Sequence, residues 1–149
     1  MTRSSTTTVR AMTAGDVERV AALSGELGYP SAPEQIAARF RAMQERTDAV
    51  VFVAADVDGV VQGWVHVYGR YHVESDRTAE IGGLVVASES RGKGIGRSLM
   101  AAAEAWARER GYGQVRLGSN TLRADAHRFY QNLGYTIAKS HYRFQKSVR

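Results

Sequence analysis

The residues best suited to chemistry form a glycine-rich turn in the second half of the chain. Gly92, Gly94 and Gly96 follow an apolar run and directly precede a helical pattern. Glycines leave backbone N–H groups uncovered, and the start of a helix carries partial positive charge. Three cationic side chains lie at the same place: Arg91, Lys93 and Arg97. This combination predicts a turn that binds phosphate, in particular a diphosphate.

Two common phosphate motifs do not fit this turn. A Walker loop requires Ser or Thr after Gly-Lys, but Gly92-Lys93 is followed by Gly94. The dinucleotide fingerprint requires a glycine where Arg97 stands, and a later acidic residue at a strand end to hold a ribose, which is missing. A turn that only joins a strand tightly to a helix, with solvated cations, remains the alternative.

A second glycine signal precedes the turn. Gly82-Gly83 interrupts an apolar stretch that predicts a strand over residues 79–86. Paired glycines inside a strand indicate a β-bulge or a place where a ligand approaches the backbone closely. Relief of crowding beneath a helix is the alternative explanation for the pair.

Length and composition limit the classes of protein to consider. The chain has 149 residues, is 44% hydrophobic and carries a formal charge of +5, which predicts one domain spanning residues 1–149. It contains no Cys, which excludes disulfides, thiolate metal sites and a cysteine nucleophile. No apolar run is long enough to span a bilayer and the N-terminal residues do not resemble a secretion signal, so a cytoplasmic location is expected.

Periodicity and turn residues predict an α+β order of elements. The expected strands are residues 8–12, 49–56, 60–71, 79–86 and 115–117, followed by one or two strands within 135–148. The expected helices are residues 17–27, 33–46, 94–110 and 125–133, with glycines ending three of them. Asp58-Gly59 predicts a two-residue hairpin. The glycine turn therefore lies inside a strand-helix-strand unit.

The stretch Arg91-Gly92-Lys93-Gly94-Ile95-Gly96 resembles the Arg/Gln-x-x-Gly-x-Gly/Ala signature of the GNAT superfamily, the acyl-CoA-dependent N-acyltransferases. The resemblance continues through Asn120, residues 126–130 and residues 133–135, and so covers the half of the chain from about Glu80 onward. The overall pattern is most similar to small bacterial aminoglycoside-type members. It implies an α+β (αβα) fold: a mixed, mostly antiparallel sheet of six to seven strands, splayed between its two central parallel strands, with about four flanking helices.

In this family acetyl-CoA lies in the opening of the sheet. Carried onto this sequence, the resemblance makes the turn the cradle for the CoA pyrophosphate and the strand before it the partner of the pantetheine arm. An asparagine after the next strand would bind a pantetheine amide. The implied cofactor-binding residues are Leu84, Val85, Val86, Arg91, Gly92, Lys93, Gly94, Ile95, Gly96, Arg97 and Asn120. The backbone N–H of Val85 is also the expected oxyanion donor.

Attack of an amine on a thioester requires removal of the amine proton and a proton for the leaving thiolate. Glu80 resembles the position where many family members place a general base, and His66 and His72 are rival bases. Tyr130 matches the tyrosine that protonates the CoA sulfur, a task that suits a phenol in an apolar pocket. Glu80 and Tyr130 are therefore the expected catalytic residues of a direct transfer in a ternary complex.

The acceptor is expected to be a small-molecule amine, held by aromatic and charged side chains of the first half of the chain. The candidates are residues 27–30, Trp64, His66, Tyr68, Tyr71, His72 and Glu74. A peptide acceptor and a non-catalytic regulator that binds acyl-CoA remain alternatives. No metal, membrane or nucleic-acid partner is expected, since the basic C-terminal stretch fits a half-buried strand better than a nucleic-acid site. A homodimer is one assembly that the sequence allows.

Overall fold

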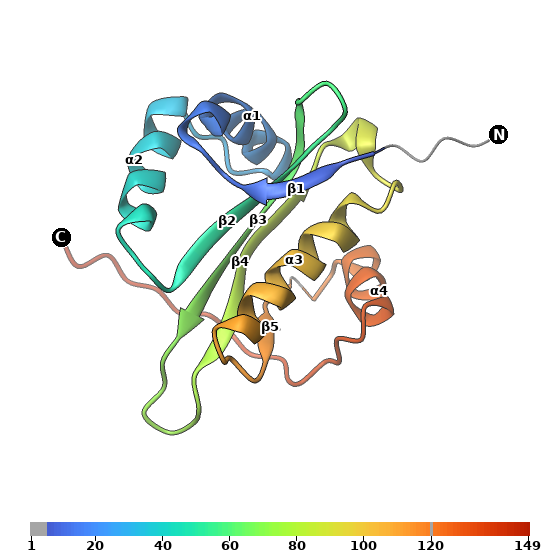
Figure 1. Cartoon of the computed structure of the whole chain (residues 1–149). Coiled ribbons are helices and arrows are strands. Elements are labelled where there is room, and N and C mark those ends of the chain that lie inside the picture. Colours follow the sequence, from blue (N-terminus) through green and yellow to red (C-terminus); the bar gives the residue numbers. More distant parts are fainter. Residues whose placement is uncertain (1–5, 120) are drawn as a thin grey trace. The chain divides into compact units, whose positions relative to one another are not determined.

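A computed structural model describes residues 6–119 and 121–149. Contacts within the chain divide it into two compact units, Met1–Leu117 and Gly118–Arg149, which are described separately. The expectation of a single domain over residues 1–149 stays a prediction. The first unit carries the sheet and most of the expected site residues (Figure 1).

The first unit is built on a mixed five-stranded sheet. Its strands lie in chain order: β1 (Thr8–Ala11), β2 (Ala49–Ala55), β3 (Val61–Arg70), β4 (Thr78–Val86) and β5 (Val115–Leu117). Neighbouring strands from β1 to β4 are antiparallel, whereas β4 and β5 are parallel. A parallel pair needs a long crossover, and the helix that follows the glycine turn supplies it.

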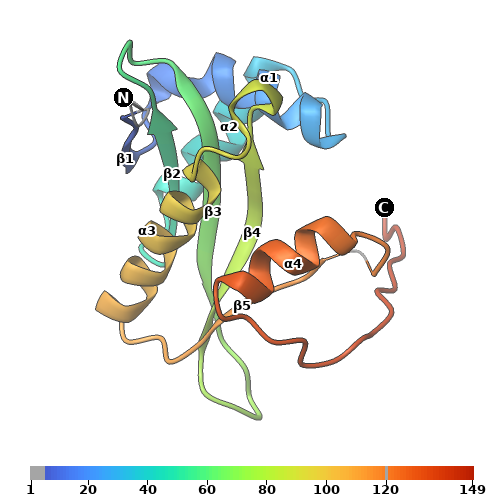
Figure 2. The same cartoon turned by 90° about the vertical axis from the view of Figure 1, so that its right-hand side faces the viewer.

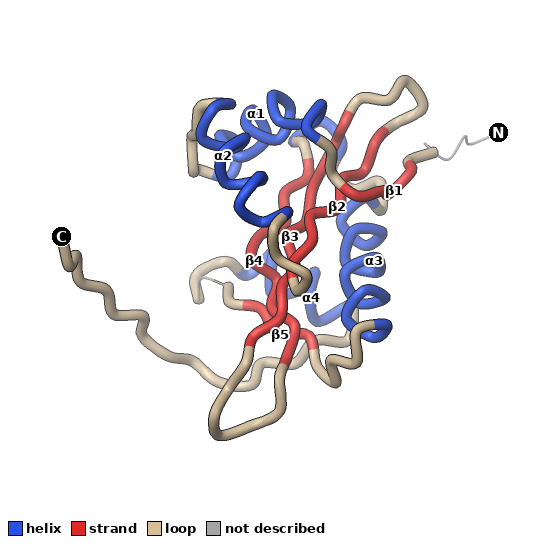
Figure 3. The backbone as a smooth tube through the Cα atoms, turned by 60° about the vertical axis from the view of Figure 1, so that its left-hand side comes forward, coloured by secondary structure: helices blue, strands red, loops and turns tan. Residues whose placement is uncertain are grey.

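Helices cover both faces of this sheet (Figures 2 and 3). The long helix α3 (Ile95–Glu109) lies on one face, where its Leu99 and Ile95 side chains come within 3.1 and 3.3 Å of the position that a Cβ at Gly63 would take. Helices α1 (Val17–Leu27) and α2 (Pro33–Gln44) lie on the other face. There, Leu23 and Phe40 share a buried cluster with side chains of β2 and β4.

Strand β3 shows why this sheet is covered on two sides. Val65 and Val67 are fully buried, while the alternate positions Trp64, His66 and Tyr68 are half-buried, so the burial follows the period of a strand. Val65 lies on the same face as Gly63, toward α3. The half-buried set carries the aromatic residues Trp64, His66 and Tyr68 on the opposite face. Because one face of β3 is apolar and the other aromatic and polar, the candidate site side chains of β3 share one side of the sheet.

The second unit contains helix α4 (Ala124–Asn132), and Gly134, two residues beyond its end, has a φ of 96°. Residues 135–149 form no helix or strand. The one or two strands expected within 135–148 are therefore wrong for this structure. The described residues carry five strands rather than six or seven, whereas the expected four α-helices are confirmed. An isolated strand is not stable without a neighbouring backbone, so a strand pattern alone does not make a strand.

Candidate functional site

A β-bulge interrupts β4 at the glycine pair. His66 pairs with Gly83 and Val67 pairs with Ile81, so Gly82 is an extra residue without a partner on β3. Space also requires glycine here, because a Cβ at Gly82 would lie 2.5 Å from Nδ1 of His66. A Cβ at Gly83 would lie 2.8 Å from the Trp64 ring. The bulge that the glycine pair predicted is present, and aromatic side chains of β3 fill the space that the glycines leave.

The sheet opens on the other side of β4 immediately beyond this bulge. The parallel ladder pairs Ala79 with Val115 and ends at Ile81 and Leu117. Among the described residues, no strand pairs with residues 82–86 on that side of β4. Gly82 is exposed and Leu84 and Val86 are half-buried. This stretch of backbone is therefore available to an extended ligand.

Two of the three glycines in the turn have a left-handed backbone conformation. Gly92 and Gly94 have φ values of 80° and 81°, in the left-handed region that other residues avoid. Gly94 caps α3, and the amide of Ser98 donates to the Gly94 carbonyl at 3.0 Å. Within the described part of the chain, no backbone hydrogen bond is found for the amides of residues 91–97 that would compete with a ligand.

Positive charge surrounds these amides. Arg91, Lys93 and Arg97 are exposed, and Nε of Arg91 donates to the Val86 carbonyl at 3.3 Å. That contact joins the turn to the open end of β4. The free amides, the positive end of the α3 dipole and the cations together form a site for a multiply charged anion. A polar hollow of about 300 Å³, lined in part by Lys93 and Ile95, lies beside the turn.

A larger hollow of about 620 Å³ lies elsewhere in the first unit. It is lined by residues 75–78 and by side chains and backbone between Gly111 and Arg116. Thr78 begins β4 and Gly82 follows four residues later, so this hollow lies at the end of β4 that is remote from the glycine turn. Its lining residues include neither the free amides of a helix start nor the bulge. The glycine turn is therefore a better candidate for the functional site than this larger hollow.

Glu80 lies on β4 two residues before the bulge. Its side chain is 17% exposed, and its carboxylate lies 3.6 Å from Nη1 of Arg70 at the end of β3. It pairs with Tyr68 across the antiparallel ladder. Sequence reasoning missed the Arg70 contact, because the pairing of these strands depends on the loop between them and on the bulge. Glu80 is thus a largely covered carboxylate that forms an ion pair with Arg70 and stands in register with Arg116 of β5.

His66 and Trp64 each carry a buried polar atom without a partner. Among the described residues, Nε2 of His66 and Nε1 of Trp64 have no hydrogen bond. Burial lowers the pKa of His66, so its imidazole is neutral at neutral pH. The His66 ring stacks on Tyr68 with centroids 5.1 Å apart. Buried polar atoms of this kind are uncommon in folded proteins and often mark a position where a ligand or water completes the bonding.

Comparison with known proteins shows to which family this fold belongs. Residues 18–135 match the family described as the acetyltransferase (GNAT) family. The chain belongs to this family. The matched range includes the bulge, the open end of β4, the glycine turn and α4, so the GNAT resemblance of the sequence is confirmed.

Individual relatives support the assignment of the chain to the GNAT family. The chain is 39% identical over 92 residues to the aminoalkylphosphonate N-acetyltransferase of Salmonella typhimurium, covering 61% of this chain and 58% of that protein. It is 27% identical over 132 residues to the aminoglycoside N(6')-acetyltransferase type 1 of Stenotrophomonas maltophilia, covering 86% and 85%. Other curated relatives are matched over 30% to 48% of their own length, with 48% for the streptothricin acetyltransferase of Streptomyces lavendulae.

The GNAT fold also recurs among solved structures. An aminoglycoside N-acetyltransferase solved in complex with CoA superposes with a TM-score of 0.86 at 19% identity, covering 99% of both chains. A structure from Bacillus halodurans described as a transcriptional regulator superposes with a TM-score of 0.83 at 25% identity, covering 95% of this chain and all of the other. The α+β GNAT-like fold expected from the sequence is therefore confirmed in its architecture.

The two other residues that the GNAT resemblance marks, Asn120 and Tyr130, belong to the second unit. Tyr130 lies on α4, where its ring meets Phe129 and Tyr135 edge-on at centroid distances of 5.1 and 6.0 Å. Burial raises the pKa of Tyr130, so its phenol keeps its proton at neutral pH. Asn120, the expected contact to the pantetheine amide, lies outside the described residues.

No group of three or more His, Asp or Glu side chains is placed to hold a metal ion within residues 6–119 and 121–149. In the same ranges, no helix combines the length and apolar character that crossing a bilayer requires.

Proposed function

We propose that this protein transfers an acetyl group from acetyl-CoA to the primary amine of a small molecule, by direct attack in a ternary complex. One arrangement carries the proposal: the free amides of the glycine turn directly follow the unpaired end of β4. An anion-binding turn next to an open strand fits a ligand with a diphosphate at one end and an extended, amide-containing arm at the other. Acetyl-CoA has that chemistry and supplies an activated acetyl thioester.

The glycine turn and the open end of β4 suit the diphosphate and the extended arm of this ligand. The turn would hold the diphosphate through backbone N–H groups, with three cations neutralising its charge. The unpaired backbone of β4 would pair with the arm as an added strand does. The proposed binding residues are Leu84, Val85, Val86, Arg91, Gly92, Lys93, Gly94, Ile95, Gly96 and Arg97, with Asn120 as a further contact. The N–H of Val85 is the proposed donor to the thioester carbonyl oxygen.

Glu80 is the proposed general base. An alkyl amine has a pKa of about 10, so its proton must be removed before attack at neutral pH. The Glu80 carboxylate is well covered and stands on the strand that leads into the open region. A carboxylate at this position can take the amine proton directly or through one bridging water.

Tyr130 is the proposed donor of a proton to the leaving thiolate. Its raised pKa keeps the hydroxyl protonated at neutral pH, and its aromatic neighbours provide the apolar surroundings expected for this task. The absence of Cys from the chain excludes a cysteinyl acetyl-enzyme. Direct transfer from thioester to amine is consistent with this composition.

His66 is the rival base, and the structure supports its candidacy in one respect. A neutral imidazole with an unbonded Nε2 can accept a proton. His72, the other rival, is already engaged, since its Nε2 lies 3.2 Å from Oγ1 of Thr78. His66 and Glu80 are therefore the two bases that substitution has to distinguish.

Relatives support a small-molecule acceptor. The names of three curated relatives specify an aminoalkylphosphonate, an aminoglycoside and streptothricin as substrates of those proteins. In this chain, Tyr29 is 71% exposed beside the end of α1, and Tyr71 is 66% exposed just after β3. Exposed aromatic faces attract cationic amines. A peptide acceptor is the alternative within the same chemistry.

A screen for CoA release tests the proposal directly. The protein is incubated with acetyl-CoA and with aminoalkylphosphonates, aminoglycosides, polyamines, amino acids and peptides, and products are identified by a mass gain of one acetyl group. The proposal predicts acetylation of at least one small amine far above hydrolysis. Binding of acetyl-CoA without transfer to any amine would instead indicate an acyl-CoA-binding regulator. Transfer to peptides alone would show that the acceptor is a peptide and not a small molecule.

A further inference from the structure

The larger hollow of the first unit, about 620 Å³ in volume, lies near Glu80. Thr78 and Arg116 are among the residues that line it. Thr78 lies two residues before Glu80 on β4, and Arg116 is the partner of Glu80 on the neighbouring strand β5 (Figure 2). Side chains two residues apart on a strand, and side chains of partner residues on adjacent strands, lie on the same face of a sheet. Glu80 therefore shares its face of the sheet with two residues of this hollow.

Glu80 also separates this hollow from the site proposed for acetyl-CoA. Gly82 and the open stretch of β4 follow Glu80 toward the glycine turn, whereas the lining residues 75–78 precede it. A thioester that lies along residues 82–86 therefore approaches Glu80 from one end of β4, and the hollow approaches it from the other. The attacking amine must lie close to the base and to the thioester at once. The hollow can thus hold the rest of an acceptor whose amine lies at Glu80.

Arginine side chains give this hollow a positive charge. Arg77 and Arg116 line it, together with one acidic residue, Asp76. Nη2 of Arg77 donates to the carbonyl of Arg110 at 3.0 Å, and the Arg77 guanidinium lies 4.8 Å from the centre of the Tyr112 ring. These contacts fix the position of Arg77 and leave its charge in place, because neither partner is a carboxylate.

Arg116 has a guanidinium without a carboxylate partner. Within residues 6–119 and 121–149, no ion pair is found for Arg116, which is exposed and donates through Nε to Oε1 of Gln114 at 3.2 Å. The carboxylate of Glu80, its partner residue on β4, lies instead 3.6 Å from Nη1 of Arg70. A guanidinium offers two parallel N–H groups that match the oxygens of a carboxylate or a phosphate. Arg116 is therefore suited to bind an anionic group of a ligand.

We propose that Arg116 selects acceptors that carry an anionic group close to the amine, so that the substrates are short zwitterionic amines. This inference rests on the proposed acetyl transfer. Adjacent strands lie about 4.8 Å apart, so an amine at Glu80 and an oxyanion at Arg116 are spaced as in a short amino acid or an aminoalkyl phosphate. A second amine in place of the anion would face Arg77 and Arg116, and like charges repel. Arg116 determines specificity and takes no part in the proton transfers.

The first test compares amines of similar length with the wild-type protein. β-Alanine carries a carboxylate, β-alaninamide is neutral, the corresponding propanediamine is cationic, and phosphoethanolamine carries a tetrahedral anion. They are added to the CoA-release screen and compared by kcat/KM for the unprotonated amine. The best amine of the screen should carry an anionic group, and its kcat/KM should exceed that of its neutral counterpart by about tenfold or more.

The possible outcomes separate this inference from the proposed function. Preference for a carboxylate or for a phosphate would each support it and would identify the anion. If the best amine is neutral or carries only cationic groups, the inference is overturned while the proposed acetyl transfer stands. If acetyl-CoA binds but no amine of any kind is acetylated, both are overturned.

The second test removes the charge of Arg116. Arg116→Gln should lower kcat/KM for the best anionic amine by about 10- to 100-fold and leave that for its neutral counterpart nearly unchanged. Arg116→Lys keeps the charge without the paired N–H groups and should restore part of the loss. The Kd for acetyl-CoA, measured by calorimetry, should not change in either variant. Arg108→Gln, at an exposed arginine of α3, is the matched control. An equal loss for every amine, or unchanged kinetics in Arg116→Gln, would overturn the proposal.

Discussion

Gly82 and His66 occupy positions so close together that only glycine fits beside the imidazole. A Cβ at Gly82 would lie 2.5 Å from Nδ1 and 3.1 Å from Cε1 of His66. The φ of Gly82 does not lie in the left-handed region, so the requirement for glycine is one of space rather than of backbone conformation. The bulge and the buried imidazole therefore depend on each other.

Gly82→Ala is expected to destabilise the protein by about 1–3 kcal/mol, because the added methyl group forces His66 out of its position. Chemical denaturation measures the loss. His66→Ala removes the obstacle, so the double variant should be more stable than the sum of the two single changes predicts. Gly113→Ala, at a glycine with open space around the Cβ position, is the matched control. Additive effects of the two substitutions would contradict the proposed packing.

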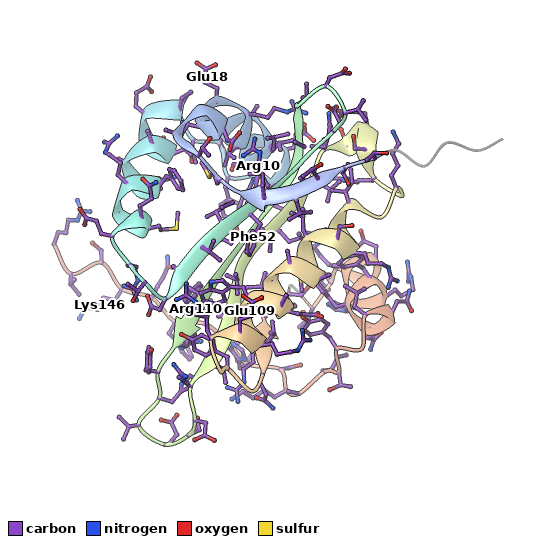
Figure 4. All side chains as sticks on the ribbon, in the orientation of Figure 1. Arg10, Glu18, Phe52, Glu109, Arg110 and Lys146 are labelled. Atoms are coloured by element: carbon purple, nitrogen blue, oxygen red, sulfur yellow. The ribbon has the colours of Figure 1, made fainter. Side chains whose placement is uncertain are left out.

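Glu80→Gln should lower kcat by about 10²- to 10⁴-fold, with a smaller change in the affinity for acetyl-CoA, because the amide cannot accept the amine proton. Steady-state kinetics with the best amine from the screen measures both. Glu18→Gln is the control, since Glu18 is exposed on α1 and projects into solvent (Figure 4). A larger loss of kcat in His66→Gln than in Glu80→Gln would transfer the role of base to His66.

Tyr130→Phe should lower kcat by about 10-fold or more while the Kd for acetyl-CoA stays within a few fold, because only the proton donor is removed. Since burial raises the pKa of Tyr130, the hydroxyl remains protonated throughout the neutral range and kcat should show no loss there from tyrosine ionisation. Tyr135→Phe removes a neighbouring phenol oxygen and serves as control. Equal activity of Tyr130→Phe and the wild-type protein would exclude the hydroxyl from the reaction.

Asp16→Asn should cost about 1–3 kcal/mol of stability at pH 7. Asp16 is buried, and both of its oxygens accept bonds from Arg10, at 2.8 and 2.9 Å. The Arg10 bonds, with further bonds from Thr13, hold the pKa of Asp16 below its ordinary 3.8. Because the folded pKa is the lower one, this stabilisation is complete above about pH 4 and disappears as the pH falls through the folded pKa.

Denaturation at pH 7 and near pH 3 measures that dependence. The difference in stability between the wild-type protein and Asp16→Asn should shrink at the lower pH. Asp58→Asn, at an exposed turn position, should be neutral at both. An undiminished difference at low pH would show that the ion pair is not what Asp16 contributes.

Local signals allowed much of the fold to be predicted from sequence. Gly28 and Gly111, both at positive φ, follow the ends of α1 and α3, as the sequence predicted, because left-handed backbone at a helix end strongly favours glycine. Strand β5 has the predicted bounds. The turn at residues 91–96 was likewise predictable, since its glycines and cations are contiguous.

Features that depend on pairing between distant residues were not predictable. The two-residue hairpin expected at Asp58-Gly59 is instead a five-residue loop, because Asp56 accepts bonds from the amides of Asp58 and Val60 at 2.9 Å. The contact of Arg70 with Glu80 depends on strand register, which the Gly82 bulge shifts. The missing final strand needs a partner backbone that no local pattern can specify.

The central claim is that the amides opening α3 hold the diphosphate of acetyl-CoA, and Gly94 offers the most direct variant. Gly94→Asp adds a carboxylate beside the anion and strains a residue with a φ of 81°, so affinity should fall by about 100-fold or more. Gly94→Asn has nearly the same size without the charge, and Asn tolerates this conformation better than most residues, so it should bind more tightly than Gly94→Asp. Gly113→Asp is the control, since it introduces the same charge at a glycine outside the turn.

Calorimetric titration of the wild-type protein and these variants with acetyl-CoA is the measurement that decides. We expect a saturable, single-site heat for the wild-type protein and for Gly113→Asp, and none for a folded Gly94→Asp protein. A wild-type protein that shows no saturable binding at millimolar acetyl-CoA, or a Gly94→Asp protein that binds as tightly as the wild type, would contradict the account.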